Sequence, residues 1–468
     1  MQKGSQMKKI GLLPLYLKLY DETCAFMRPK IESFRDTIVK QLENRGLNMV
    51  CAPICRRKEE FSAAVKNLEE ANVSAIVTLH LSYSPSLECI DTLLETKLPL
   101  VVLDTTESYA FDSSVSSDEI LYNHGIHGVQ DMCNLLKRHK KPYAIFAGHY
   151  EQSDVLDRVA AYCRGTQIAS TFRSSRVGMV GEPFCGMGDF FVPFEELAER
   201  FDMEIVQYDH QTAKKRIDGI SRQEIDRERR IDEEIFIWDP SVSDVLYDRT
   251  AKVSLALRKW VDEQKLTAFS VNFLETAGGN PGLPVMPFTE CCKAMVRGIG
   301  YAGEGDVLTA ALCGALLQFF PETTFMEMFC PDWKGDSIFL SHMGELNYRI
   351  CNGKPRLTEM IFPYTSAENP TVAYGTFRAG TSVIVNLAPC ADGRFTLILA
   401  LGEMLKVSSE NNMEESVNGW FKPRQALPDF LESYSRAGGT HHSVMIYANC
   451  LPELVSFAEA MDFDCVII

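Results

Sequence analysis

The first third of the chain alternates short apolar runs with longer amphipathic segments, and this alternation restricts the fold more than any other feature. The apolar runs are KKIGLLPLYL (8–17), NMVCAPI (48–54), SAIVTLHL (74–81), LPLVVLDT (98–105) and YAIFAGH (143–149). The intervening segments, such as RPKIESFRDTIVKQLENRG and FSAAVKNLEEA, carry apolar residues at helical spacing. Strands that alternate with helices form a parallel sheet with helices on both faces. The sequence therefore predicts a flavodoxin-like α/β domain at residues 1–175.

The rest of the chain predicts two further domains, which suits a length of 468 residues. An expected strand at 176–184, a long helix at 241–264 and a strand at 266–274 continue the alternation. They predict a second α/β domain at residues 176–325. From residue 326 to 468, β-rich runs are broken by Gly, Pro and Asp-Gly turns, and CADGR (390–394) is typical of a hairpin turn. This pattern predicts a β-rich, barrel-like C-terminal domain.

The charge balance excludes one class of partner. The formal net charge is -16, from 47 basic and 63 acidic residues. A nucleic-acid-binding surface needs an excess of Lys and Arg to neutralise phosphates, so no nucleic-acid partner is expected. The densest charge run, ISRQEIDRERRIDEE (220–234), mixes both signs at helical spacing and predicts a solvated helix face.

The cysteine content and the hydropathy of the sequence indicate the cellular compartment in which the protein is expected. The chain has 15 cysteines and no CxxC pair, which is not typical of a secreted disulfide framework. The opening segment MQKGSQMKKIGLLPLYLKLYD (1–21) has only a short apolar stretch, carries Lys18 and lacks a small-residue cleavage site, so it predicts an opening strand and not a signal peptide. No run approaches the roughly 18 apolar residues that a membrane helix needs. We therefore expect a cytoplasmic protein with reduced thiols and no membrane partner.

Four side chains in the second half of the chain are candidate metal ligands. They are Glu304 in GYAGEGD, Glu327 in TTFMEMF, His342 in FLSHMGE and His442 in AGGTHHS. Each lies at the edge of a small-residue, hydrophobic or turn segment and not in a charged surface helix. Two carboxylates and two imidazoles can bind one divalent cation and leave room for two adjacent substrate oxygens. This type of centre suits aldose–ketose isomerisation, although any one of these residues taken alone is more often structural.

The residues of these four segments, and their order along the chain, resemble the motifs of the L-arabinose isomerase family and, more distantly, those of the L-fucose isomerase family. The resemblance places the metal ligands of that family on Glu304, Glu327, His342 and His442. It implies an aldose–ketose isomerase that acts on an L-arabinose- or L-fucose-like sugar through an enediolate. A divalent metal, with Mn²⁺ as the expected ion, would serve as cofactor. Glu304 and Glu327 would also be the catalytic proton-transfer residues.

The same resemblance implies where the sugar is held. VNFLE places an aromatic residue, Phe273, against the sugar. His441, beside the fourth ligand, would either support the metal ligands or face the substrate. In the N-terminal half, TLHLSYSPSLECI and LYNHGIHG place Tyr83, His124 and His127 at sugar-contacting positions. The family further implies a homo-trimer or homo-hexamer with shared active sites. In such an assembly, the N-terminal residues of one subunit reach the metal site of its neighbour.

Departures from the family pattern leave the sugar open. GLLPLYLKLYD (11–21) lacks a Gln that would contact substrate, MFCPDW (328–333) replaces an Asp-Tyr-Thr-Tyr run, and the matched sequence ends at DFDCVII. A non-catalytic sugar-binding protein that retains the isomerase fold is one alternative. A metal-dependent aldolase or epimerase is another. The full set of four ligands favours the isomerase.

Overall fold

The computed structural model describes residues 8–408 and 410–468, so the first seven residues of the expected N-terminal domain lie outside the described residues. The chain forms two compact units. One contains the described residues up to Ser170 together with Pro452–Met461, and the other contains Thr171–Leu451 and Asp462–Ile468. The domain boundaries expected near residues 175 and 325 stay predictions. No helix in the described part of the chain is sufficiently long and apolar to cross a bilayer.

The N-terminal unit is built on a parallel five-stranded sheet with the order β2-β1-β3-β4-β5. Its strands are β1 (Lys9–Leu15), β2 (Met49–Cys51), β3 (Val73–His80), β4 (Leu100–Asp104) and β5 (Ala144–Ala147). These are the five apolar runs that the sequence predicts as strands. The order 2-1-3-4-5 is that of flavodoxin-like sheets. The predicted fold of this region is therefore confirmed.

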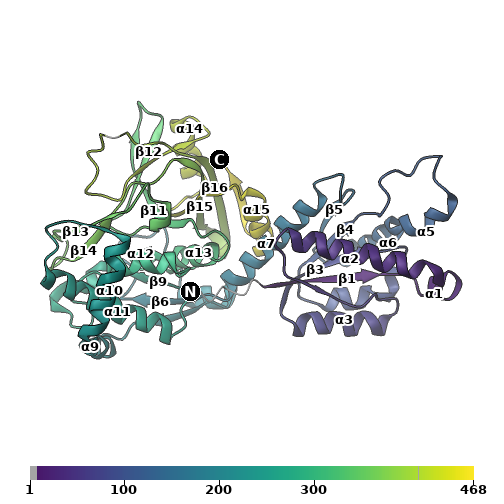
Figure 1. Ribbon diagram of the computed structural model, residues 1–468, viewed down its shortest axis with the longest axis horizontal. Coiled ribbons are helices and arrows are strands. Elements are labelled where there is room, and N and C mark those ends of the chain that lie inside the picture. The colour runs from purple at the N-terminus through teal and green to yellow at the C-terminus, as the bar shows by residue number, and fades with distance from the viewer. Residues whose placement is uncertain (1–7, 409) are drawn as a thin grey trace. The chain divides into compact units, whose positions relative to one another are not determined.

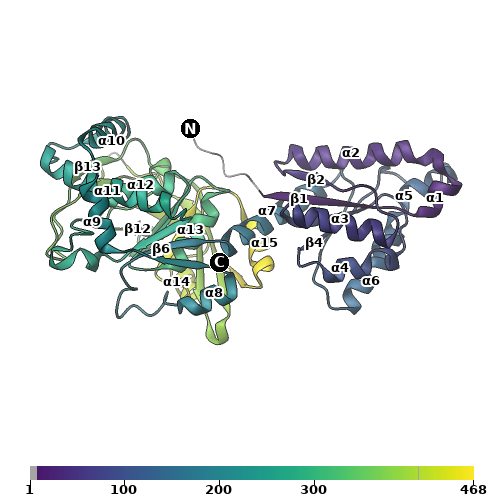
Figure 2. The same cartoon turned by 90° about the horizontal axis from the view of Figure 1, so that it is seen from below.

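Helices cover both faces of this sheet because successive strand side chains point to opposite sides. Ile10 and Leu12 of β1 pack in one core cluster, and Leu13 and Leu15 pack in another. Figures 1 and 2 show α2 and α3 on opposite faces. The first face carries α2 (Arg28–Asn44) and α7 (Val155–Arg173), and the second carries α3 (Lys58–Glu70), α4 (Ile90–Glu95) and α6 (Gly125–Arg138). The short helices α1 (Lys18–Thr23) and α5 (Ile120–Asn123) follow strands, and α15 (Leu451–Met461) joins α7 through Glu453 and Arg164.

The second unit begins with a parallel four-stranded sheet of order β10-β9-β6-β7. Its strands are β6 (Arg176–Val180), β7 (Glu204–Gln207), β9 (Ala268–Val271) and β10 (Gly300–Gly303). Its helices are α8 (Phe194–Phe201), α9 (His210–Asp218), α10 (Arg222–Ile235), α11 (Asp244–Glu263), α12 (Phe288–Val296) and α13 (Val307–Leu317). Every residue of α13 is buried, because α13 contacts β6, β9 and β10 as well as β11, β15 and β18. This helix thus links the parallel sheet to the strands that follow (Figure 1).

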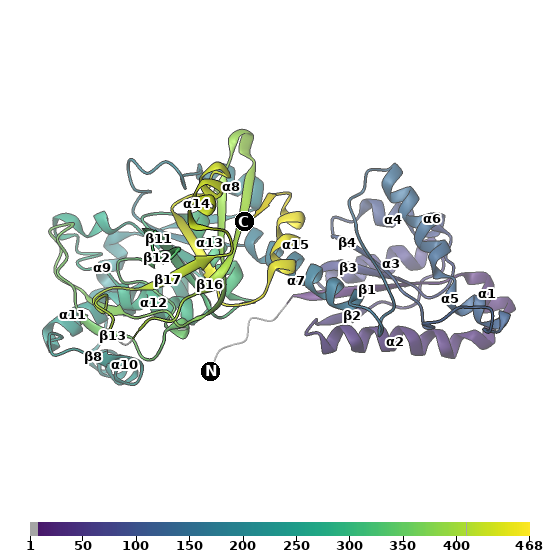
Figure 3. The same cartoon turned by 90° about the horizontal axis from the view of Figure 1, so that it is seen from above.

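Those later strands close into a barrel. The sheet order is β15-β18-β11-β12-β17-β16-β19, and β15 also pairs with β16, which completes the ring. Figure 3 shows β11, β12, β17 and β16 next to one another. The strands are β11 (Thr323–Asp332), β12 (Ser337–Ser341), β15 (Gly380–Pro389), β16 (Phe395–Met404), β17 (Gly419–Pro423), β18 (His442–Ile446) and β19 (Asp464–Ile467). The predicted barrel-like, β-rich architecture is confirmed.

Smaller elements complete this unit. The predicted turn at 390–394 joins β15 to β16, and Asp392 and Gly393 adopt the positive φ that such hairpin turns favour. A small sheet has the order β14-β13-β8, formed by β8 (Ile237–Trp238), β13 (Arg356–Glu359) and β14 (Thr371–Tyr374). Helix α14 (Leu427–Arg436) packs on β17 through Phe430 and Phe421.

The prediction of a solvated face for the charge run at 220–234 is wrong at two positions. The run forms α10, which Ser221 and Glu224 begin with a capping box. Glu228 and Asp232, however, are only 4% and 2% exposed. Lys293 of α12 lies between them, with Nζ 2.6 Å from Glu228 Oε1 and in contact with Asp232. The two carboxylates can be buried because a cation from a neighbouring helix compensates their charge.

We predict that Lys293→Met destabilises this unit by about 3–5 kcal/mol, because it leaves the buried Asp232 without its cation and leaves Glu228 with Arg258 alone. The measurement is urea unfolding followed by tryptophan fluorescence, since the four tryptophans all lie in this unit. Lys214→Met, which removes an exposed ion pair with Asp218, is the control and should cost less than about 1 kcal/mol. Equal unfolding midpoints for the two variants would contradict this interpretation.

Candidate metal centre

Glu304 lies in the turn between β10 and α13, in the left-handed region with φ of 62°. A non-glycine residue there is strained by roughly 1–2 kcal/mol, so the surrounding structure must hold it. Its N–H donates to Val271 O at 2.9 Å, and the N–H of Gly305 donates to Ser270 Oγ at 2.9 Å. The turn thus places Glu304 at the carboxyl ends of β9 and β10. Ligands of parallel α/β sheets collect at this edge, and strained residues often mark functional sites.

The register of the barrel strands brings the other candidate ligands together. Glu327 of β11 pairs with Ser341 of β12 on one side and with His442 of β18 on the other. Residues directly opposite in an antiparallel pair have Cβ atoms about 4.5–5.5 Å apart. His342 follows Ser341 immediately. The end of β12 and the start of β18 therefore converge on Glu327 of β11.

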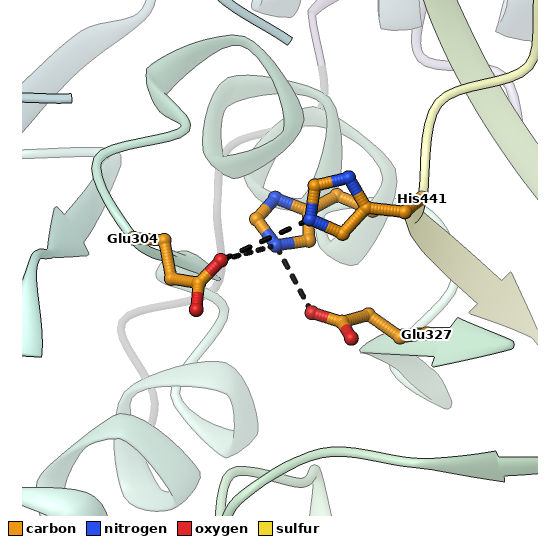
Figure 4. Close-up of side chains that lie close together, drawn as sticks. Glu304, Glu327 and His441 are labelled. Atoms are coloured by element: carbon orange, nitrogen blue, oxygen red, sulfur yellow. Dashed lines mark ion pairs between the residues drawn. The ribbon is translucent and has the colours of Figure 1, made fainter. Parts of the chain in front are cut away.

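The side chains of these residues point toward one another, as Figure 4 shows for Glu304, Glu327 and His441. Glu327 Oε1 lies 3.0 Å from His442 Nε2 and 3.2 Å from His342 Nε2. Glu304 Oε2 lies 3.4 Å from His442 Nε2 and 3.8 Å from His441 Nε2. One ligand atom from each of Glu304, Glu327, His441 and His442 lies within 4.8 Å of the others. Because ligand bonds to such ions are about 2.0–2.2 Å long, this spacing suits donors around one ion.

A carboxylate holds the far nitrogen of each of the three imidazoles. The Nδ1 atoms of His342, His441 and His442 lie 2.5, 2.7 and 3.0 Å from oxygens of Glu345, Asp189 and Asp306, respectively. A carboxylate at Nδ1 fixes the orientation of the ring and the tautomer in which Nε2 is free to bind a metal. The three Nε2 atoms face Glu304 or Glu327. This carboxylate–imidazole arrangement is the one that metal-binding histidines usually have.

The acidic members of the cluster are held ionised. Burial alone raises the pKa of Glu304, but the neighbouring imidazoles of His441 and His442 outweigh burial and hold that pKa at about 2. Burial also raises the pKa of Glu327, and His342 and His442 again outweigh it and move the pKa well below its ordinary value. Both carboxylates are therefore charged at neutral pH.

The pKa values of His342 and His442 shift in the opposite direction, upward. Burial lowers the pKa of His342, but Glu345 and Glu327 overcome this effect and raise the pKa to about 10. Burial likewise lowers the pKa of His442, and Asp306 and the ligand carboxylates raise it well above its ordinary value. The carboxylates around both imidazoles thus favour the charged form of each ring.

The chemistry of the donors fits a divalent cation. Glu304 Oε2 and His442 Nε2 are buried, and neither makes a well-directed hydrogen bond in the described structure. Phe190 stacks on His442 with ring centroids 4.9 Å apart, and the edge of Phe325 meets His342 at 4.7 Å. These buried rings limit water access. Carboxylate oxygens combined with imidazole nitrogens suit Mn²⁺ and neighbouring transition metals.

Comparison with known proteins decides the family. Models of the L-arabinose isomerase N-terminal, central and C-terminal domains match residues 19–174, 196–319 and 322–464. The chain belongs to the L-arabinose isomerase family. The central match contains Glu304, and the C-terminal match contains Glu327, His342 and His442.

Several relatives named L-arabinose isomerase align along most of this chain. The protein of Geobacillus thermodenitrificans is 27% identical over 468 residues, which cover 94% of this chain and 90% of the relative. The protein of Shouchella clausii is 22% identical, with 98% of this chain and 93% of the relative covered. The protein of Shigella flexneri is 24% identical, with 90% and 86% covered. The chain is therefore a divergent member of this family of sugar isomerases.

Within this family member, the structure brings Glu304, Glu327, His342 and His442 together at the distances given above. His441, which the resemblance suggests should either support the metal ligands or face the substrate, lies at the same cluster. Their roles as ligands stay predictions. Three carboxylates were absent from the site residues predicted by sequence, namely Asp189, Asp306 and Glu345. Asp306 and Glu345 have a local signal, because each lies two or three residues from a candidate ligand, whereas Asp189 has none.

Phe273 packs against Phe184, which in turn contacts the Glu304 turn of the cluster. Phe273 begins the 3-10 helix η4 (Phe273–Gly279), and its ring lies 5.6 Å from that of Phe184 and 6.0 Å from that of Tyr364. The N–H of Phe184 donates to Glu304 O at 2.9 Å. Phe273 is thus positioned beside the Glu304 turn, and its contact with the sugar stays a prediction.

The N-terminal candidates form a cluster of their own, in the other compact unit. The ring of His124 lies 5.3 Å from that of His127, and Tyr83 lies 6.5 and 6.4 Å from these two rings. Tyr20, which the sequence did not single out, lies with Oη 3.1 Å from His124 Nε2. The cluster follows the carboxyl ends of β1 and β3, the switch point of a 2-1-3-4-5 sheet. Its role in substrate binding stays a prediction.

We predict that binding of Mn²⁺ at this centre releases protons. The pKa values of His342 and His442 are raised, so both imidazoles are protonated at about pH 7, whereas Glu304 and Glu327 are already ionised. Each imidazole must lose a proton before Nε2 binds a cation, so the affinity should rise with pH below the raised values. Titration calorimetry in buffers of different ionisation enthalpy measures this release. A buffer-independent enthalpy together with a pH-independent Kd would contradict it.

Proposed function

We propose that this protein is a divalent-metal-dependent aldose–ketose isomerase acting on an L-arabinose- or L-fucose-like sugar. One observation carries the proposal. The Nε2 atoms of His342 and His442 lie next to the ionised carboxylates of Glu304 and Glu327 in one buried cluster. A further carboxylate lies at hydrogen-bonding distance from Nδ1 of each of these imidazoles and so fixes the ring. The family of the chain supports the reaction class, since its relatives are named for isomerisation of L-arabinose.

Glu304, Glu327, His342 and His442 would hold the cation, with Mn²⁺ as the expected ion. A bound divalent cation supplies Lewis-acid stabilisation of the negative charge that develops on two adjacent sugar oxygens. Asp306 hydrogen-bonds His442 and so fixes the imidazole beside both carboxylates. The chain thereby prepares the donors before the ion and the sugar arrive, which reduces reorganisation during the reaction.

We assign the proton transfers of the reaction to Glu304 and Glu327. Conversion of an aldose to a ketose requires that a proton leave C2 and that a proton reach C1, while the hydroxyl proton moves from O2 to O1. Glu304 and Glu327 are both ionised, so either carboxylate can accept the C2 proton and deliver it to C1. The neighbouring imidazoles orient these carboxylates. Phe190 and Phe325 limit the entry of water that would exchange the transferred proton.

We predict that Glu304→Gln and Glu327→Gln each lower kcat by about 10²–10⁴-fold, because loss of a proton-transfer group alone costs that much. The assay incubates the Mn²⁺-loaded protein with a panel of aldoses and measures ketose formation. Glu403→Gln, on an exposed position of β16, is the matched control and should keep full activity. If either site variant isomerised a confirmed substrate at the wild-type rate, its proton-transfer role would be wrong. Sugar binding without turnover by the wild type would instead support the non-catalytic alternative.

We further propose that the site is shared between subunits of a homo-trimer or homo-hexamer. Apolar side chains are exposed on the segments around the N-terminal cluster, namely Leu19, Leu87, Tyr109, Phe111 and Ile126. Others are exposed near the metal cluster, namely Phe191, Leu274, Ile361 and Tyr364. We propose that the residues of each set gather into an apolar patch, because large contiguous patches of this kind mark protein contact surfaces. A head-to-tail ring would let Tyr83, His124 and His127 of one subunit reach the metal centre of the next.

This assembly predicts that two inactive variants restore each other. His127→Ala and Glu304→Gln are mixed under conditions that allow subunit exchange, and ketose formation is measured. Some interfaces then pair an intact His127 with an intact metal centre, so activity should partly return. A mixture of Glu304→Gln with Glu327→Gln is the control and should stay inactive, because every metal centre keeps one defect. Lack of recovery in the first mixture, despite proven exchange, would refute the shared site.

A further inference from the structure

We infer that Tyr301 positions the imidazole of His342 for metal binding by holding Glu345, the carboxylate behind that ring. Tyr301 lies on β10, the strand that leads directly into the Glu304 turn, and its side chain is fully buried. The inference rests on the proposed function, since it presumes that the cluster binds a divalent cation, and it leaves the four proposed ligands unchanged. Tyr301 acts through Glu345 and is therefore a positioning residue.

The first step is a buried chain of hydrogen bonds that begins at Tyr301. Its Oη donates to Glu345 Oε1 at 2.7 Å. The other oxygen of this carboxylate, Oε2, lies 2.5 Å from His342 Nδ1 and accepts from the N–H of Gly344 at 3.0 Å. Both oxygens are thus engaged, so the plane of the carboxylate is fixed. Because an ionised carboxylate only accepts hydrogen bonds, it keeps a proton on Nδ1 and leaves Nε2 directed at Glu327.

The second step is the face that β10 presents to the imidazole. Successive side chains of a strand point to opposite faces, so Tyr301 and Gly303 share one face of β10. A Cβ atom added at Gly303 would lie only 3.1 Å from Cε1 and 3.3 Å from Nε2 of His342. The bare backbone of Gly303 therefore bounds the ring beside Nε2, while Tyr301 holds Nδ1 through Glu345. One strand thus limits the rotation of the imidazole at both nitrogens.

The third step is the packing that fixes the hydroxyl of Tyr301. The edges of the Tyr301 and Phe269 rings meet at a centroid distance of 5.3 Å, and Tyr301 meets Phe325 at 5.8 Å. Phe325 in turn packs against His342. Because these contacts involve the ring and not the hydroxyl, Tyr301→Phe keeps the packing and removes only the hydrogen bond to Glu345.

Another buried tyrosine in the same unit provides the matched control. Tyr247 is 2% exposed, and its Oη donates to the buried Asp232 at 2.8 Å. Asp232 pairs with Lys293 in the helical layer. Tyr247→Phe therefore removes the same kind of hydrogen bond, from a phenol to a buried carboxylate, at a carboxylate that pairs with a lysine. A purely structural hydroxyl at Tyr301 would make the two variants equivalent.

The test measures metal binding, which does not depend on activity. Titration calorimetry gives the Mn²⁺ affinity, and the visible absorption of bound Co²⁺ reports the geometry of the ligands. Loss of a partner directly behind a ligand costs about 10–100-fold in affinity, so Glu345→Gln should approach that range. Tyr301 lies one hydrogen bond further away, so Tyr301→Phe should weaken Mn²⁺ binding by about 3–10-fold and shift the Co²⁺ spectrum. Tyr247→Phe should lower the melting temperature and leave both metal readouts as in the wild type.

A double-mutant cycle tests whether Tyr301 acts through Glu345. Residues in one hydrogen-bond chain have effects that are not additive. In the Glu345→Gln background, Tyr301→Phe should therefore cause a smaller fold loss of Mn²⁺ affinity than it causes in the wild type. Equal fold losses in the two backgrounds would show that Tyr301 acts by another route and would overturn the inference.

The outcomes distinguish this inference from the function on which it rests. If Tyr301→Phe bound Mn²⁺ with wild-type affinity and gave an unchanged Co²⁺ spectrum, while His342→Ala lost the ion, the inference would be overturned and the metal centre would stand. Equal losses of affinity in Tyr301→Phe and Tyr247→Phe would reduce Tyr301 to a stabilising residue and would also overturn it. If the wild type bound neither Mn²⁺ nor Co²⁺, the proposed function would fail, and the inference with it.

Discussion

The carboxylate of Glu327, buried between the imidazoles of His342 and His442, is the interaction on which the site depends. Moving charged groups out of water costs several kcal/mol per ion unless partners compensate them. Alternating charges compensate this cost. Glu345 and Asp306 lie on the outer sides of His342 and His442, and Glu327 lies between the two imidazoles. The register of β11 with its two neighbours sets these contacts. A register shift of one residue would turn Glu327 to the other face of the sheet and dissolve the cluster.

Closure of the barrel and burial of α13 fix the position of Glu304 relative to Glu327 and His442. Because α13 contacts both the parallel sheet and the barrel, the Glu304 turn at its N-terminus is fixed relative to β11 and β18. Asp306 contributes twice, since it caps α13 through Thr309 N and hydrogen-bonds His442. The helix start and the imidazole are thereby joined through one side chain. Strain at Glu304, with its positive φ, is tolerated because this framework holds the turn.

Much of this architecture could be predicted from the sequence, because hydrophobic periodicity reports local structure directly. The five N-terminal strands, helix α11 and the hairpin turn at 390–394 follow from such patterns. The candidate ligands were found through short motifs that resemble a known family, since a separation of 23 positions between Glu304 and Glu327 contains no spatial information. Their convergence depends on strand register and barrel closure, which are non-local.

Most of the features that sequence reasoning missed are long-range pairings, and the exception is Glu345, which lies three residues from its partner His342. Glu228 and Asp232 look like members of a solvated helix face, because the compensating Lys293 lies about sixty residues away on another helix. Asp189 lies in a glycine-rich loop without a recognisable motif, and its partner His441 is 252 residues away. Charge compensation across such separations appears only once the chain is folded.

The central claim is that one divalent cation binds at the cluster of Glu304, Glu327, His342 and His442. Anomalous X-ray diffraction from crystals of the protein equilibrated with Mn²⁺ tests it most directly. The account predicts a single strong anomalous peak about 2.0–2.3 Å from the ligand atoms of these residues. A Mn²⁺ peak elsewhere in the chain, or no peak at this cluster under saturating Mn²⁺, would contradict the account.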